Sequence, residues 1–289
     1  MTQSQFLLVC LLLTVVIAST WLRRRMTDVM LFYPERGQTR TPGDLGLTYE
    51  ETHPLAQDGV HTEFWWMPAD GPVVLFFHGN AGTMGDRLDI ARQLHDLGAA
   101  VAFSEYRGYG NSEGRPNESG LYLDARAALV QARQLAGNRP VIVAGRSLGG
   151  AVAIELAATE AVDGLVVESS FTSLADIAGA TGIPFAGRLA AYDFDSRSKI
   201  AQVSAPILIT HGDADELVPF AMGRELETTA RHGASPEVRF HAVSGGGHND
   251  IILTGGNPYW QAWASFLAHV ETLPPMGSER EKSDPMDPS

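Results

Sequence analysis

Residues 141–150 read VIVAGRSLGG, and this stretch decides the fold. Its first five residues are a continuous apolar run, which is typical of a strand buried on both faces of a sheet. Residues 148–159 are small and apolar, and they predict a helix packed closely on that sheet. Between strand and helix, residues 145–149 fit the pattern Gly-x-Ser-x-Gly. Flanking glycines allow a sharp turn there, so the hydroxyl of Ser147 is held out at the carboxyl end of the strand.

The same alternation of strand and helix runs through most of the chain. Further buried strands are expected at 73–78, 100–105, 165–168, 206–211 and 237–242, after an opening strand pair at 47–52 and 59–67. Helices are expected at 86–97, 117–136, 220–232 and 258–270. Strands that alternate with helices form a mostly parallel, twisted sheet covered on both faces, so the fold belongs to the α/β class.

Length and composition suit one large folded domain. The chain has 289 residues, of which 44% are hydrophobic and 19% charged, and this excludes a chain that is disordered throughout. We predict an α/β domain at residues 47–272, preceded by a connector at 26–46. The polar, proline-rich residues 273–289 predict a disordered tail.

Charge and motif content exclude several classes of function. Lys and Arg number 21 against 34 Asp and Glu, a net charge of −13 that would repel the phosphate backbone of a nucleic acid. The single cysteine, Cys10, allows no intrachain disulfide and no cysteine-based zinc site. The glycines between positions 108 and 114 lack the spacing of a nucleotide-binding loop. We therefore expect no metal, no organic cofactor and no nucleic-acid partner.

The N-terminus has the features of a membrane anchor. Residues 6–22 read FLLVCLLLTVVIASTWL, 17 uncharged residues at the short end of a bilayer span, and Arg23–Arg25 follow at once. We predict an uncleaved anchor at residues 1–25, and the arginines favour a cytoplasmic globular domain. A cleaved signal peptide, with small residues at Ala18 and Ser19, and a buried core helix are the alternatives.

A serine nucleophile needs a base, and the base needs an orienting acid. His248 follows three glycines and the last predicted strand, a setting that suits a turn presenting one imidazole. In this topology the acid lies between serine and histidine in the sequence. Residues 213–216 read DADE, from which we favour Asp215, with Asp213 as the alternative. The alternative interpretation of Ser147 is an ordinary helix cap.

An oxyanion requires backbone N–H donors already in place. One is expected from Leu148, directly after the serine. The other is expected from Asn80, in the segment HGNAG at residues 78–82. The alternative for this segment is a plain glycine-rich turn.

Four motifs together resemble one family. They are HGNAG at residues 78–82, YRGYGNSEG at 106–114, GRSLGG at 145–150, and HGDAD at 211–215 with Val218-Pro219. They look like the α/β-hydrolase superfamily and, within it, the Bem46-like, ABHD-type membrane-anchored serine hydrolases.

The resemblance implies Ser147 as nucleophile, Asp215 as acid and His248 as base. It also implies the cleavage of esters or thioesters. The segment at residues 171–203 is too short for a large lid domain. One position departs from the pattern, because Ser104-Glu105 stands where relatives often carry a single Asp.

We predict a serine hydrolase that cleaves carboxylic ester or thioester bonds through an acyl-enzyme near a membrane surface. Its substrate would be a small-molecule or protein-linked acyl ester. A peptidase and a catalytically silent, membrane-tethered binding scaffold are the alternatives.

Overall fold

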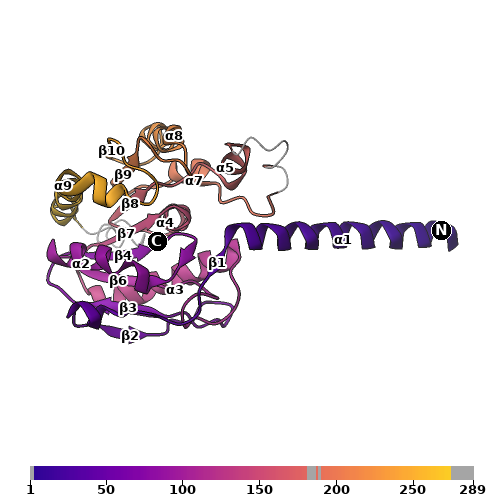
Figure 1. The fold of residues 1–289 in the computed structure, drawn as a ribbon, viewed down its shortest axis with the longest axis horizontal. Helices are drawn as coiled ribbons and strands as arrows, with labels where there is room; N and C mark the ends of the chain where they lie inside the picture. The colour runs from indigo at the N-terminus through magenta and orange to yellow at the C-terminus, as the bar shows by residue number, and fades with distance from the viewer. Residues whose placement is uncertain (1–2, 181–186, 188–189, 275–289) are drawn as a thin grey trace, which may run out of the picture.

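The computed structural model describes residues 3–180, 187 and 190–274 (Figure 1). Its centre is an eight-stranded sheet in the order β10-β9-β8-β7-β4-β6-β3-β2. The strands are β2 (Glu50–Thr52), β3 (Phe64–Met67), β4 (Val73–Phe77), β6 (Ala100–Ser104), β7 (Val141–Arg146), β8 (Gly164–Glu168), β9 (Ile207–Gly212) and β10 (Val238–Val243). Neighbours from β10 to β6 pair in parallel, whereas β3 runs antiparallel to both β6 and β2. This confirms the predicted mostly parallel sheet.

The central strands are buried on both faces because their side chains alternate between two cores. In β4, Val73, Leu75 and Phe77 join one hydrophobic cluster. Val74 and Phe76, between them, join the cluster on the opposite face. A strand with water on one face would need polar residues at every second position, so a continuous apolar run is what this placement requires.

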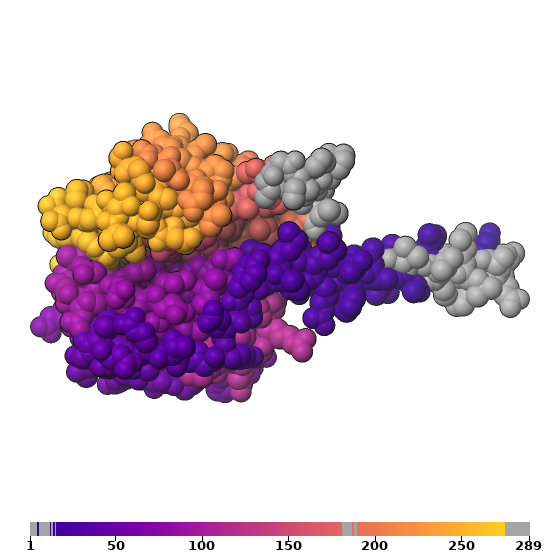
Figure 2. Space-filling model, viewed as in Figure 1, coloured from indigo at the N-terminus to yellow at the C-terminus, as the bar shows by residue number. Residues whose placement is uncertain are grey.

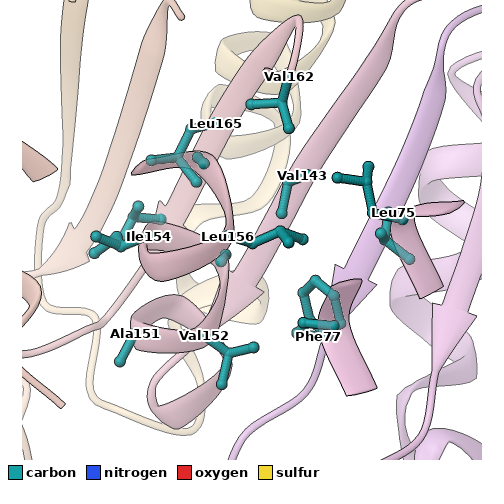
Figure 3. Packing of buried hydrophobic residues seen from close by; sticks show 14 of the residues in the cluster. Leu75, Phe77, Val143, Ala151, Val152, Ile154, Leu156, Val162 and Leu165 are labelled. Atoms are coloured by element: carbon teal, nitrogen blue, oxygen red, sulfur yellow. The ribbon is translucent and has the colours of Figure 1, made fainter. Parts of the chain in front are cut away.

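Helices cover both faces of the sheet. The cluster that holds Leu75 includes residues of α3 (Glu118–Ala136), α4 (Leu148–Thr159) and α8 (Phe220–Arg231). The opposite cluster includes residues of α2 (Leu88–Asp96) and α9 (Ile251–Glu271). Figure 3 shows α4 placing Val152 and Leu156 against the strands that carry Val143 and Phe77. Helix α9 begins seven residues before the expected start, and it bends at Gly256.

The described part of the chain between β8 and β9 forms a small cover rather than a large lid. In the described part of this segment lie two short helices, α5 (Leu174–Ala180) and α7 (Ser196–Ile200). Leu174 and Ile200 are buried in the core beside α4. The prediction of an α/β-hydrolase fold without a large lid domain is therefore confirmed.

Helix α1 (Gln3–Leu31) stands out from the body of the domain (Figures 1 and 2). It leads into β1 (Tyr33–Pro34), which pairs in parallel with β5 (Ala81–Gly82) directly after β4. Two 3₁₀ helices, η1 (Pro42–Leu45) and η2 (Met84–Arg87), complete this region. The part of the chain expected to be a connector thus contains β1 and η1.

A search of the described residues finds no helix whose length and apolarity together suffice to cross a membrane. The anchor at residues 1–25 stays a prediction. Most of the predicted tail, residues 275–289, lies outside the described residues.

Candidate active site

Ser147 occupies a strained turn between β7 and α4. Its φ of 54° and ψ of −117° lie in a region that residues with a side chain rarely adopt. The neighbouring glycines make the turn possible, because a Cβ on Gly145 would lie 2.0 Å from the carbonyl oxygen of Gly149. The turn matches the sharp, strained geometry that presents a nucleophile at the end of a strand.

The loop after β4 lies directly beside this turn. A Cβ on Gly149 would lie 2.1 Å from the carbonyl oxygen of Phe77, the last residue of β4. A Cβ on Gly79 would lie 3.7 Å from the Cβ of Ser147, which is ordinary van der Waals contact. The segment from His78 to Asn80 is thus next to the serine, as an oxyanion loop would have to be.

His248 and Asp215 meet although 33 positions separate them in the sequence. His248 Nδ1 lies 2.8 Å from Asp215 Oδ2, a hydrogen-bond distance. The side chains are 8% and 0% exposed, so water competes little for this contact. Asp215 lies in the loop after β9 and His248 in the loop after β10, because adjacent parallel strands bring their carboxyl ends to the same edge of the sheet.

The carboxylate of Asp215 is held in its ionised form. Burial raises the pKa of Asp215, but hydrogen bonds from His211 and His248 and from the Val218 N–H lower it by more, so the pKa lies well below its usual value. Asp215 Oδ1 accepts the N–H of Leu217 at 2.9 Å and that of Val218 at 2.7 Å. These contacts fix the oxygen that faces His248.

The other acidic side chains nearby hold the histidine loop through its backbone. Asp213 accepts the N–H of Gly245 at 2.6 Å, and Glu216 accepts that of His248 at 3.1 Å. Asp250 accepts the N–H of Gly247 at 2.6 Å. Sequence reasoning missed these roles. The sequence gives only a weak signal for these roles, namely several acidic residues close to a glycine-rich turn. Such a turn has backbone N–H groups that need acceptors.

Arg146 links the serine turn to the histidine loop. Its guanidinium donates a hydrogen bond to the main-chain carbonyl of His248 and lies 3.1 Å from Glu168 Oε1. Glu168 in turn accepts a hydrogen bond from the buried hydroxyl of Tyr259. In the described part of the chain Ser147 and His248 form no direct hydrogen bond, and catalytic bonds of this kind often tighten only when substrate binds.

Buried polar contacts also fix the loop after β4. His78 Nε2 lies 2.5 Å from Glu105 Oε1, and both side chains are buried. Glu105 Oε2 accepts the N–H of Met84 at 3.0 Å. The glutamate that departs from the resembled pattern therefore ties β6 to the segment beside Ser147.

The two predicted oxyanion donors come from the two segments that meet at the serine turn, the start of α4 and the loop after β4. Leu148 is the first residue of α4, so its N–H has no acceptor within the helix and remains available. Asn80 directly follows Gly79, which lies in van der Waals reach of Ser147. Within residues 3–180, 187 and 190–274, no three His, Cys, Asp or Glu side chains group closely enough to hold a metal ion.

Comparison with known proteins adds independent evidence. The family described as "Serine aminopeptidase, S33" matches residues 69–192. Protein bem46 of Schizosaccharomyces pombe is 33% identical over 255 residues, which cover 83% of this chain and 83% of that protein. The alpha/beta hydrolase domain-containing protein WAV2 of Arabidopsis thaliana is 35% identical over 251 residues, 78% of this chain and 81% of that protein.

A solved structure supports the fold. The esterase PF2001 of Pyrococcus furiosus superposes with a TM-score of 0.71 at 20% identity, covering 83% of this chain and 98% of that one. The extent and identity of the sequence matches confirm the resemblance found from the motifs. The chain therefore belongs to the α/β-hydrolase family, among its Bem46-like members, and is a hydrolase.

Proposed function

We propose that this protein is a serine hydrolase that cleaves carboxylic ester or thioester bonds through an acyl-enzyme intermediate. The observation that carries the proposal is the 2.8 Å contact of His248 Nδ1 with Asp215 Oδ2, in a loop bonded through Arg146 to the strained turn of Ser147. A silent scaffold would have no need of a buried imidazole–carboxylate pair beside a strained serine.

Each of these residues has a role in one step of acyl transfer. Ser147 Oγ attacks the substrate carbonyl carbon while its proton passes to His248 Nε2. The N–H groups of Leu148 and Asn80 stabilise the oxyanion of the tetrahedral intermediate. Collapse of the intermediate releases the alcohol or thiol, which takes the proton from His248. Water, deprotonated by the same imidazole, then attacks the acyl-enzyme and frees the carboxylic acid and Ser147.

Esters and thioesters are preferred here over amides on chemical grounds. An alkoxide or a thiolate leaves a tetrahedral intermediate more readily than an amine, so less leaving-group assistance is required. The description of the matched family names an aminopeptidase, which makes amide cleavage the alternative to test.

The full chain is expected to hydrolyse p-nitrophenyl esters and acyl thioesters at least ~100-fold faster, in kcat/KM, than p-nitroanilide amides of the same acyl or aminoacyl group. Steady-state kinetics over acyl chains of two to sixteen carbons measures this and gives the preferred chain length. Faster cleavage of aminoacyl anilides than of every ester would favour the peptidase instead.

We also propose that α1 holds the hydrolase at a membrane surface, with Arg23–Arg25 and the domain on the cytoplasmic side. The support is the uncharged run at residues 6–22 and the exposure of apolar side chains on α1, among them Leu12, Val16 and Ile17 at 57%, 56% and 66%. Exposed aliphatic side chains in such number on one projecting helix favour an apolar environment.

Replacing Leu12, Val16 and Ile17 together with aspartate is expected to weaken binding of the full chain to phosphatidylcholine–phosphatidylglycerol vesicles by more than ~100-fold, because each buried aspartate costs about 3 kcal/mol. Co-sedimentation measures the bound fraction. Val130 on α3 is 54% exposed and serves as the matched control, since Val130→Asp should bind as the wild type does. Vesicle binding unchanged by the triple substitution would refute this role of α1.

A further inference from the structure

The end of helix α1 is hydrogen-bonded directly to the loop beside Ser147. The side-chain amide of Asn80 donates to the carbonyl of Leu31, the last residue of α1, at 2.9 Å. The carbonyl of Asn80 accepts the N–H of Tyr33 at 3.0 Å, where β1 begins its pairing with β5. These two bonds, one donated by the side chain of Asn80 and one accepted by its carbonyl, fix Asn80 against the chain that leaves α1.

A third bond reaches Asn80 from inside the domain. The hydroxyl of Tyr109 donates to the carbonyl of Asn80 at 2.8 Å. Tyr109 is fully buried, and its ring lies edge-on to His78 with the centroids 5.6 Å apart. Burial raises the pKa of Tyr109, so its hydroxyl stays protonated and remains a donor.

The last turns of α1 are themselves attached to the cover beside the site. The N–H of Ala191 donates to Thr27 Oγ1 at 3.1 Å, and the hydroxyl of Tyr192 donates to Asp28 at 2.5 Å. The buried ring of Phe32 packs on that of Tyr192, with centroids 5.8 Å apart. Figure 1 shows α1 leaving the domain beside β1. The direction of the helix end is therefore set by contacts with two separate segments, the loop after β4 and residues 191–192.

We propose that the end of α1, together with β1, positions the oxyanion loop through the side chain of Asn80. The inference rests on the proposed function, in which the backbone N–H of Asn80 faces the developing oxyanion. Such a donor is effective only when it is held in place before the reaction, and an error of about 1 Å in a positioned group can cost about 100-fold in rate. Asn80 acts here as a positioning residue through its side chain, and residues 27–33 are part of the active-site framework.

The test is Asn80→Ala in the full chain, which keeps the backbone N–H and removes the bond to Leu31. We expect kcat to fall by about 10-fold to 100-fold, with KM within about threefold of the wild type. The inhibition constant of a trifluoromethyl ketone, whose adduct carries an oxyanion, should rise by the same factor as kcat falls. If Asn80 had a purely structural role, the substitution would lower the melting temperature, and the rise in the inhibition constant would not match the fall in kcat.

A second variant covers the case in which Asn80→Ala does not fold. Tyr109→Phe removes only the hydroxyl bond to the Asn80 carbonyl and is expected to lower kcat by about threefold to 10-fold. Tyr122→Phe is the matched control, because the Tyr122 hydroxyl bonds Glu118 and does not contact Asn80. A wild type without esterase activity overturns the proposed function. If the wild type is active and folded Asn80→Ala has the same kcat, only the positioning role is overturned. If Asn80→Ala does not fold, an unchanged kcat in Tyr109→Phe overturns that role in the same way.

Discussion

Ser147→Ala is expected to abolish covalent labelling by a fluorophosphonate probe and to lower kcat for the best ester by roughly 10⁵-fold to 10⁶-fold. The effect is large because alanine leaves no oxygen to form the acyl-enzyme. The remaining rate would come from water attacking a substrate that is still bound and polarised by the N–H groups of Leu148 and Asn80. The change is small in volume, and alanine at position 147 keeps the same strained backbone, so the fold should survive.

Labelling followed by intact-mass spectrometry measures this directly, since one phosphonyl group adds to one serine. Ser244→Ala is the matched control, because Ser244 is an exposed serine in the loop that carries His248. Its labelling and kcat should equal those of the wild type. Covalent labelling that persists in Ser147→Ala would assign the nucleophile to another residue.

The strands and the serine turn could be predicted because their signals are local. A continuous apolar run such as residues 73–78 has one stable placement, between two covered faces, and the structure indeed divides its side chains between two cores. The turn at Ser147 needs glycine at positions where a Cβ would strike backbone atoms, so its glycines are visible in the sequence. In these strands and in this turn, the sequence pattern directly reflects what the packing requires.

The contacts that support the site could not be predicted, because they join residues far apart in the sequence and leave no periodic pattern in it. The pairing of β1 with β5 involves two residues on each strand, too few for an alternating pattern. Arg146 stands at a position the serine motif leaves free, and its bond to the His248 carbonyl spans 102 positions. The choice between Asp213 and Asp215 likewise depends on which loop atoms meet, and the two carboxylates contact different groups.

Asp215→Asn is expected to lower kcat by about 10⁴-fold while leaving KM nearly unchanged. An asparagine amide can donate to His248 Nδ1, which would leave the proton on Nε2 and remove the lone pair that must accept the proton of Ser147. The two N–H groups of Leu217 and Val218, which now converge on Asp215 Oδ1, favour an oxygen at that position. They would therefore turn the amide nitrogen of asparagine toward the imidazole, which is the orientation that blocks catalysis.

The same substitution has a consequence for stability that depends on pH. The pKa of Asp215 is lowered in the folded protein relative to about 3.9 in the unfolded chain, so its ionised form contributes stability that is present above about pH 4. That contribution is lost as the pH falls toward the folded pKa. The melting temperature of the wild type should therefore drop toward that of Asp215→Asn as the solution is acidified from pH 7 to pH 3, as differential scanning calorimetry can measure.

Asp213→Asn separates the catalytic role from a general effect of removing a carboxylate near His248. Asp213 is exposed and lies two positions away, and it accepts only the N–H of Gly245 among the hydrogen bonds of the described residues. Its loss should loosen the loop and lower kcat by less than about 10-fold, since one exposed hydrogen bond contributes about 1 kcal/mol. If Asp213→Asn instead reduced kcat as strongly as Asp215→Asn, the orienting acid would be misassigned. The 2.8 Å contact between His248 and Asp215 would then be one of several exchangeable arrangements of the loop rather than the one that catalysis requires.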